Sequence, residues 1–270
     1  MGSSAKYVSK PVDEAGFVQW TQSENRVWAE LVDTQMECIQ GRACDEYIRG
    51  LELLDLSRDE TAQIADVNKV LLNETGWQVA PVPALIDFDR FFKLLSEKKF
   101  PAATFLRTRE DMKYLQEPDY FHEIFGHCAM LTNKDFAEFT HAYGKIGSKA
   151  TKEERVYLAR LYWFTVEFGL VKHEDEFRIF GGGILSSPGE TRYVFENEER
   201  LIKPFDPVDI MRTPYRIDIM QPAYFLIDSI HALLDLAHQD IMSMVQEAKS
   251  LGLHTPLYPK KNKETEESYV

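Results

Sequence analysis

The sequence lacks the features of a membrane protein or a secreted protein. None of its apolar runs reaches the roughly 18 residues that a membrane-spanning helix needs. Residues 1–13 contain no basic stretch followed by an apolar one, so we expect no secretory signal. Cysteine is scarce, because the chain has only Cys38, Cys44 and Cys128 and no C-x-x-C pair. These absences predict reduced thiols in a cytoplasmic protein that contacts no membrane.

Positive charge is also in short supply. The chain has 31 Lys and Arg residues against 44 Asp and Glu residues, which gives a net charge of −13. A nucleic-acid-binding protein normally presents a basic face, so we do not expect nucleic acid as a partner. Apolar residues make up 44% and charged residues 28% of 270, the balance of an ordinary globular protein with a substantial core. No internal repeat or low-complexity linker divides the chain, so we expect one continuous domain.

The spacing of apolar residues predicts a mainly α-helical chain with small β elements. Helices are expected over residues 17–40, 45–54, 59–72, 87–97, 118–131, 134–143, 153–168 and 223–251. Extended chain is expected over 78–85, strands over 101–107 and 215–219, and strands with turns over 177–195. The polar composition of both ends predicts loose termini.

Two histidines in an apolar segment, His122 and His127, are the first candidates for chemistry. A buried histidine needs a hydrogen-bonding partner or a metal ion. Positions i and i+5 lie about 140° apart on a regular α-helix, so these side chains can converge only where the backbone departs from that geometry. A π-type turn helped by Gly126 would bring them together, and such turns often occur at functional sites. The spacing differs from the H-E-x-x-H motif of zinc proteases.

A third metal ligand is expected from Glu167. This carboxylate interrupts an aromatic and apolar run over residues 161–168, and a buried carboxylate without a partner is costly. Two histidines and one carboxylate form a facial triad that leaves open positions for O₂ on ferrous iron. We therefore predict a mononuclear non-haem iron oxygenase with His122, His127 and Glu167 as ligands. Two other readings stay open: a zinc hydrolase, which also uses His and Glu ligands, and a non-enzymatic helical interaction protein without metal.

Three sequence blocks resemble the pterin-dependent aromatic amino acid hydroxylases. They are Pro118-Asp119-x-x-His122-Glu123-x-x-Gly126-His127, Tyr162-Trp163-Phe164-Thr165-Val166-Glu167-Phe168-Gly169-Leu170 and Gly183-x-x-Ser186-Ser187-x-Gly189-Glu190, in the family's order and spacing. The resemblance covers residues 15–255, which we expect to be the catalytic domain between a flexible N-terminus (1–14) and a polar tail (256–270). We therefore expect neither the regulatory domain nor the tetramerisation helix that animal members carry. The chain resembles a single-domain bacterial member, expected to be a monomer or a small homo-oligomer.

The resemblance implies the reaction and its cofactors. Fe(II) and a tetrahydropterin, either tetrahydrobiopterin or a related reduced pterin, would activate O₂, with one oxygen atom going to an aromatic ring and the other to the pterin. His122, His127 and Glu167 correspond to the family's iron ligands. Tryptophan hydroxylases carry Phe at the position of Trp163, and tyrosine hydroxylases carry Asp at the position of Ile217. The expected reaction is therefore conversion of L-phenylalanine to L-tyrosine, with tryptophan or tyrosine hydroxylation as the alternative.

The resemblance also assigns the two pockets around the iron. The residues that correspond to the substrate pocket are Arg107, Trp163, Phe168, Gly183 and Ser186. Among them Arg107 would bind the substrate carboxylate, because a guanidinium group makes two parallel hydrogen bonds to a carboxylate. The residues that correspond to the pterin site are Phe91, which would stack on the pterin, Ala84, Ile86, Glu123 and Tyr162. Ser186 and Asp119 are expected to support the iron ligands by hydrogen bonds.

Overall fold

The computed structural model describes residues 7–83, 86–112, 115 and 117–258. Within these ranges the chain is mainly helical with small sheets, which confirms the expected fold class. The α-helices are α1 (Gln22–Ile39), α2 (Asp45–Leu54), α3 (Ile64–Glu74), α4 (Phe88–Ser96), α5 (Lys134–Lys149), α6 (Lys152–Tyr162), α7 (Gly182–Leu185), α8 (Pro188–Glu196), α9 (Pro207–Arg212), α10 (His231–Ala237) and α11 (Ile241–Leu251). Short 3₁₀ segments are η1 (Arg109–Asp111) and η3 (Met130–Thr132), and π-helical segments are η2 (His122–Cys128) and η4 (Trp163–Glu167).

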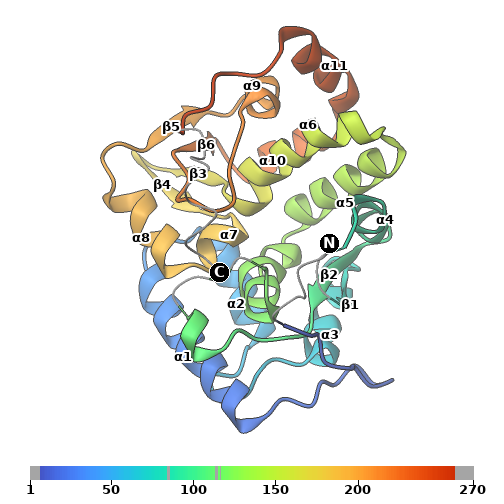
Figure 1. Ribbon diagram of the computed structural model, residues 1–270, viewed down its shortest axis with the longest axis vertical. Helices are drawn as coiled ribbons and strands as arrows, with labels where there is room; N and C mark the ends of the chain where they lie inside the picture. The colour runs from blue at the N-terminus through green and yellow to red at the C-terminus, as the bar shows by residue number, and fades with distance from the viewer. Residues whose placement is uncertain (1–6, 84–85, 113–114, 116, 259–270) are drawn as a thin grey trace, which may run out of the picture.

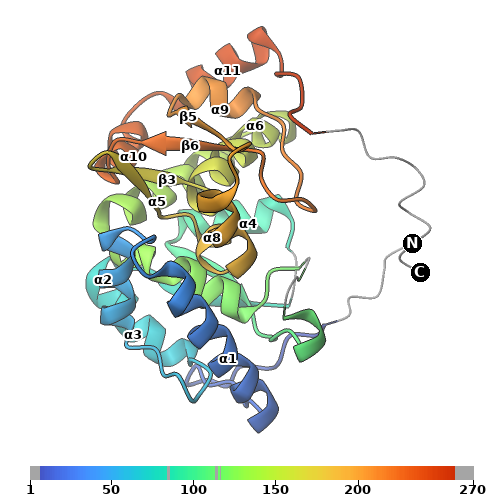
Figure 2. The same ribbon diagram turned by 90° about the vertical axis from the view of Figure 1, so that its left-hand side faces the viewer.

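The strands form two small sheets. β1 (Gln78–Val82) pairs in parallel with β2 (Lys99–Ala103). The second sheet has the order β4 (Glu176–Ile179), β3 (Leu170–His173), β6 (Ala223–Ile227), β5 (Leu201–Pro204). In it, β3 is antiparallel to β4, and β6 is parallel to both β3 and β5. This sheet, with α9 and α11, lies at one end of the molecule and α1 to α3 lie at the other (Figures 1 and 2). The segments η2 and η4 both pack on α7, and η2 also packs on β2 and η4 on β6.

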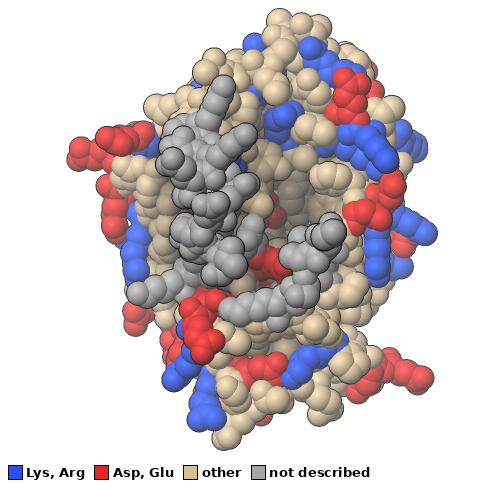
Figure 3. All heavy atoms as spheres, in the orientation of Figure 1, with Lys and Arg blue, Asp and Glu red and all other residues tan. Residues whose placement is uncertain are grey.

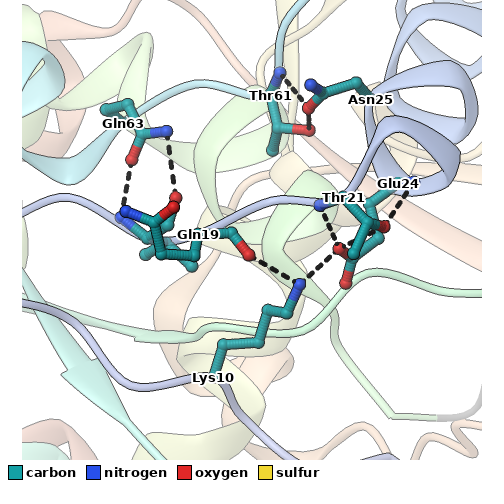
Figure 4. Close-up of polar contacts among 8 residues, drawn as sticks. Lys10, Gln19, Thr21, Glu24, Asn25, Thr61 and Gln63 are labelled. Atoms are coloured by element: carbon teal, nitrogen blue, oxygen red, sulfur yellow. Dashed lines mark hydrogen bonds and ion pairs between the residues drawn. The ribbon is translucent and has the colours of Figure 1, made fainter.

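Polar contacts join the N-terminal segment to the start of α1 (Figure 4). Thr21 caps α1, and the Glu24 side chain accepts a hydrogen bond from the Thr21 backbone N–H at 2.7 Å, which completes a capping box. Lys10, in the segment 1–14, donates to the same Glu24 carboxylate. The side chain of Gln63 pairs with the backbone N–H and carbonyl of Val18 at 2.8 and 3.2 Å. α1 therefore begins after this cap, later than the apolar spacing predicted.

The single helix predicted over residues 223–251 is wrong, because the chain there forms β6, α10 and α11. Strand β6 has the sequence Ala-Tyr-Phe-Leu-Ile and is buried along most of its length. A short apolar run with both faces covered carries no periodic signal that separates a strand from a helix. The boundary between the two helices is set by Asp240, whose side chain caps α11 by accepting from the Ser243 N–H at 3.0 Å.

Two other predictions of secondary structure were also wrong. Residues 177–195 were expected to be strands and turns, but only β4 is extended there and α7 and α8 follow it. The start of α8 has a clear local cause: the Ser187 hydroxyl accepts from the Glu190 N–H at 3.3 Å, and Pro188 occupies the first helical turn. Residues 215–219 were expected to form a strand, but they lie in a series of bends outside both sheets.

The surface carries intermingled charges. Lys and Arg side chains are scattered among Asp and Glu on the face shown in Figure 3, with no extended basic patch on that face. The same face is hollowed near its centre, where acidic side chains are visible. No helix in the described part of the chain is long and apolar enough to cross a membrane.

A buried carboxyl group joins α8 to β6. Glu190 is 8% exposed. Its Oε1 accepts from the Gln221 backbone N–H at 3.2 Å, and its Oε2 accepts from the Tyr224 hydroxyl at 2.9 Å. Burial raises the pKa of Glu190 to about 7, although both hydrogen bonds act in the opposite direction. The two elements are thus held together by a group that changes charge near neutral pH.

We expect Glu190→Gln to remove a pH dependence of stability. The folded protein binds the Glu190 proton more tightly than the unfolded chain, whose glutamate titrates near about pH 4.3. The wild type should therefore lose about 3 kcal/mol of stability as pH rises from about 4.3 to about 7, and no more above that. Melting temperatures of both proteins between pH 5 and 8 would measure this, with Glu196→Gln as an exposed control. Parallel profiles for the wild type and Glu190→Gln would contradict it.

Candidate metal centre

The two histidines lie on the π-helical segment η2. In this segment residues five apart lie on the same side of the helix, whereas a regular α-helix would separate them. The Nε2 atoms of His122 and His127 are 3.1 Å apart. Gly126 allows η2 to pack closely on α7. A Cβ at that position would lie only 2.7 Å from the carbonyl oxygen of Gly182 on α7. The backbone departure that the i, i+5 spacing requires is present.

The carboxylate of Glu167 reaches the same point from a second π-helical segment. η4 continues α6 and ends at Glu167, where the Phe168 N–H donates to the Trp163 carbonyl at 2.8 Å. Glu167 Oε1 lies 3.4 Å from His127 Nε2, and Oε2 lies 3.7 Å from His122 Nε2. The structure therefore brings together the three side chains that the sequence analysis selected as metal ligands.

The hydrogen bonds of Ser186 determine which nitrogen of His122 carries a proton. The Ser186 hydroxyl donates its single hydrogen to the Gly182 carbonyl at 2.8 Å. Its oxygen lies 2.8 Å from His122 Nδ1, so it can only accept there, and Nδ1 must be the protonated nitrogen. Nε2 of His122 then presents a lone pair toward Glu167 and His127. This is the tautomer that binds a metal ion, with the other ring nitrogen oriented by a hydrogen bond.

Packing alone holds the side of the His127 ring that faces away from the other two proposed ligands. Its Nδ1 is buried and has no hydrogen-bonding partner among the described residues. One face of the ring lies against Gly182, where a Cβ would come within 2.4 Å of the imidazole, and Phe100 lies 5.1 Å away, centroid to centroid. The absence of a side chain at Gly182 therefore leaves the space that the His127 ring occupies.

The protonation states fit a cation site. Burial lowers the pKa of His122 to about 4, although the charge of Glu167 opposes this, so the imidazole is neutral near pH 7. Two opposing effects act on the pKa of Glu167. Burial alone would raise this pKa, but the neighbouring His127 and His122 together have the larger effect, so the pKa lies below its ordinary value. A neutral imidazole and an ionised carboxylate are the forms that bind divalent metals.

A second carboxyl group, Glu123, also lies near the histidines. One ligand atom each of His122, Glu123 and His127 lie within 4.8 Å of one another. Burial, with the charges of Glu167 and Asp119, raises the pKa of Glu123 well above its ordinary value. The pKa of Glu123 is thus shifted toward the neutral acid, whereas the pKa of Glu167 is shifted toward the charged carboxylate that a metal ion requires.

The predicted carboxylate-binding residue Arg107 is held by Asp119. The guanidinium Nε and Nη2 donate to the two oxygens of Asp119, each at 2.8 Å. The backbone N–H groups of Arg107 and His122 donate to the same carboxylate at 3.0 and 3.1 Å. The pKa of Asp119 is lower than its ordinary value. Burial alone would raise it, but the charge and hydrogen bonds of Arg107 have the larger combined effect. Asp119 thus fixes Arg107 relative to the first histidine, and Nη1 has no hydrogen bond among the described residues.

Three aromatic side chains, Trp163, Phe168 and Tyr215, pack together beside Glu167 and form what we call the aromatic wall. The rings of Trp163 and Phe168 are 4.5 Å apart, and Trp163 stacks on Tyr215 at 4.3 Å with an angle of 13° between the planes. Gly183 packs against this wall, since a Cβ there would lie 3.0 Å from the Phe168 ring. The sequence analysis assigned Trp163, Phe168 and Gly183 to one pocket but missed Tyr215. No spacing signal links Tyr215 to Trp163, because the contact is made only by the tertiary fold.

Two of the predicted pterin residues, Phe91 on α4 and Tyr162 at the end of α6, contact each other. The rings of Phe91 and Tyr162 meet edge to face, with centroids 5.3 Å apart. Burial, followed by the charges of Glu167 and Glu123, raises the pKa of Tyr162, so its hydroxyl stays protonated. Ile86 is half-buried just before Asp87, the residue that caps α4. Ala84 lies outside the described residues.

Known proteins resemble this chain over nearly its whole length. The family model for biopterin-dependent aromatic amino acid hydroxylases matches residues 4–249. A relative named phenylalanine-4-hydroxylase, from Vibrio cholerae serotype O1, is 56% identical over 259 residues, which cover 96% of this chain and 90% of the relative. The apo structure of the cold active phenylalanine hydroxylase from Colwellia psychrerythraea 34H matches with a TM-score of 0.91 at 56% identity, over 93% of this chain and 97% of that one.

A more distant structure is the phenylalanine hydroxylase from Chromobacterium violaceum with bound oxidised Fe(III). It matches with a TM-score of 0.85 at 37% identity, over 93% of this chain and 94% of that chain. Both the family model and the relatives span nearly the whole described chain. This chain belongs to the biopterin-dependent aromatic amino acid hydroxylases.

Proposed function

We propose that this chain is a phenylalanine 4-monooxygenase, which converts L-phenylalanine to L-tyrosine with O₂ and a tetrahydropterin at non-haem Fe(II). The observation that carries the proposal is the convergence of His122, His127 and Glu167, with His122 Nε2 left unprotonated by Ser186. Family membership and the names of relatives at 56% identity support this reaction over a zinc hydrolase or a non-enzymatic interaction protein.

The donor set fits a mononuclear iron site. His122, His127 and Glu167 would hold the ion as a facial triad, and the Chromobacterium violaceum structure is one with bound Fe(III). Bound Fe(II) together with a tetrahydropterin supplies the activation of O₂. The protein's own contribution is to keep His122 in the binding tautomer and to lower the pKa of Glu167, which favours its charged form.

The substrate would be held at two ends. The Arg107 guanidinium, fixed by Asp119, would bind the amino acid carboxylate. The wall of Trp163 and Phe168 would bind the aromatic ring beside Glu167. Ile217, which is 56% exposed, places no charge near this wall. Tryptophan and tyrosine remain alternative substrates, because one or two pocket residues shift preference by only a few kcal/mol.

The pterin would bind in the second predicted pocket, over the ring of Phe91. A flat heterocycle stacks on an aromatic ring, and the edge of Tyr162 holds the Phe91 ring in place. The carboxyl group of Glu123 would face this pocket, and Ile86 and Ala84 would supply backbone contacts. We further propose a cytoplasmic enzyme that acts as a monomer or small homo-oligomer without nucleic acid, on the basis of its negative charge and three unpaired, buried cysteines.

The proposed function is tested by product analysis with phenylalanine, tyrosine and tryptophan in the presence of Fe(II), tetrahydropterin and O₂. We expect tyrosine from phenylalanine. The variants His122→Ala, His127→Ala and Glu167→Ala should each lose at least about 10³-fold in activity and bind little iron, because two ligands hold a metal poorly. His231→Ala, which removes an exposed histidine, should behave like the wild type. Full activity with zinc and none with iron would contradict the assignment.

We also expect Gly182→Ala to weaken metal binding without removing a ligand. The new methyl group would lie 2.4 Å from the His127 ring, so the imidazole must move. Affinity for Fe(II) or Co(II), measured by titration, should fall by about tenfold or more, in the range reported for residues that orient metal ligands. Gly189→Ala is the control, because its methyl group would meet only the end of the flexible Met220 side chain. Equal metal affinity in both variants would argue against this role of Gly182.

A further prediction concerns the substrate carboxylate. Arg107→Lys keeps a positive charge beside Asp119 but loses the planar, two-pronged donor. We expect the KM for phenylalanine to rise by about tenfold or more, while the KM for the pterin and the iron content stay near wild type. Arg178→Lys, on β4, serves as the control. An unchanged KM for phenylalanine in Arg107→Lys would exclude Arg107 from carboxylate binding.

A further inference from the structure

Gln221 is a buried side chain that no part of the proposed mechanism uses. It is 1% exposed and lies between the bends after Thr213 and strand β6. Its Nε2 donates to the carbonyls of Arg216 at 2.8 Å and Ile219 at 3.1 Å. Its Oε1 accepts from the indole Nε1–H of Trp163 at 3.0 Å. Every polar atom of this amide therefore has a partner.

The partners of Gln221 allow only one orientation of its amide group. Backbone carbonyls can only accept hydrogen bonds, so the NH₂ group must face Arg216 and Ile219. The amide oxygen is then directed to Trp163, whose indole nitrogen can only donate. A rotated amide would leave a buried carbonyl facing two others, which is costly.

The backbone of Gln221 is fixed as well. Its N–H donates to Glu190 Oε1, and Glu190 also accepts from Tyr224 on β6. Glu190, in the first turn of α8, lies four residues after Ser186, the residue that hydrogen-bonds the proposed iron ligand His122. The segment 186–190 therefore contacts the metal side through Ser186 and the aromatic wall through Glu190 and Gln221.

The hydrogen bond from Trp163 complements the stacking of its ring. Tyr215 lies parallel to the indole at 4.3 Å and Phe168 is tilted against it at 4.5 Å. Stacked rings can slide and rotate within their planes, because dispersion contacts have little directionality. A hydrogen bond at the edge of the indole removes that rotation, since it depends on the donor angle.

We propose that Gln221 is a positioning residue that fixes the in-plane orientation of the Trp163 indole, and through it the shape of the pocket for the substrate ring. The proposal rests on the proposed function, in which Trp163 lines that pocket. Gln221 makes no hydrogen bond to the metal ligands or to the predicted pterin residues in the described structure, so we expect its main effect on substrate binding.

The test is a comparison of two buried glutamines. Gln221→Met removes the amide but keeps the length of the side chain, and Gln35→Met does the same on α1, where Gln35 is 0% exposed and donates to Thr191 at 2.9 Å. We expect Gln221→Met to raise the KM for phenylalanine about fivefold, the usual effect of one lost hydrogen bond, with kcat and the KM for the pterin within twofold of wild type. Gln35→Met should lower the melting temperature but leave the KM for phenylalanine unchanged.

The Trp163→Phe variant separates positioning from a general loss of stability. A phenyl side chain at position 163 has no N–H to donate to Gln221. Adding Gln221→Met to Trp163→Phe should therefore cause no further change in the KM for the substrate phenylalanine. Additive effects of the two substitutions, an unchanged KM in Gln221→Met, or an equal rise in Gln35→Met would each overturn the proposal.

A measurement without turnover keeps the proposal distinct from the proposed function. The indole N–H resonance of Trp163, identified by its absence in Trp163→Phe, should shift and exchange faster with solvent in Gln221→Met and should stay in place in Gln35→Met. An unchanged resonance in Gln221→Met would overturn the proposal even if the enzyme is active. If the wild type did not hydroxylate phenylalanine, the proposed function would fail, and this resonance would still decide whether Gln221 holds Trp163.

Discussion

The close approach of the backbones of η2 and α7 is the constraint on which the metal centre depends. Gly126 and Gly182 make it possible, because a Cβ at either position would collide with the opposite segment. At this distance the Ser186 hydroxyl reaches both the Gly182 carbonyl and His122 Nδ1. The tautomer of one proposed ligand and the space for the other therefore follow from a single backbone contact.

Two π-helical segments perform the same geometric task on different parts of the chain. In η2, the wider π-helical turn brings His122 and His127 to one side of the helix. In η4, the same kind of turn continues α6 and ends at Glu167. Such turns have poorer hydrogen-bond geometry than an α-helix, so packing around them must compensate. Here the surrounding residues are almost entirely buried, and the neighbouring sheet strand β6 packs on η4. The fold thus supports locally unfavourable backbone where the chemistry requires it.

The sequence predicted those features that depend on residues close together in the chain. α2 has the predicted bounds, and the i, i+5 spacing of His122 and His127 required the departure from α geometry that η2 shows. Strand β6 was mistaken for helix, because its short apolar run is covered on both faces and has no period to read. The contacts of Tyr215 and Gln221 with Trp163 could not be predicted, since they join residues more than 50 positions apart through tertiary packing. The two glutamates near the histidines could be ranked only after their burial and neighbours were known.

The short segment from Ser186 to Glu190 has a thermodynamic consequence. It hydrogen-bonds a proposed metal ligand at one end and, through Gln221, the aromatic wall at the other. Any free energy that it transmits between the two sites must be the same in both directions, because linkage between binding equilibria is reciprocal. To whatever extent an amino acid in the pocket tightens the hold on the metal ion, the metal ion tightens the hold on the amino acid by an equal factor. Where such transmission occurs, loading of the two sites is one coupled equilibrium, described by a single factor that both affinities share.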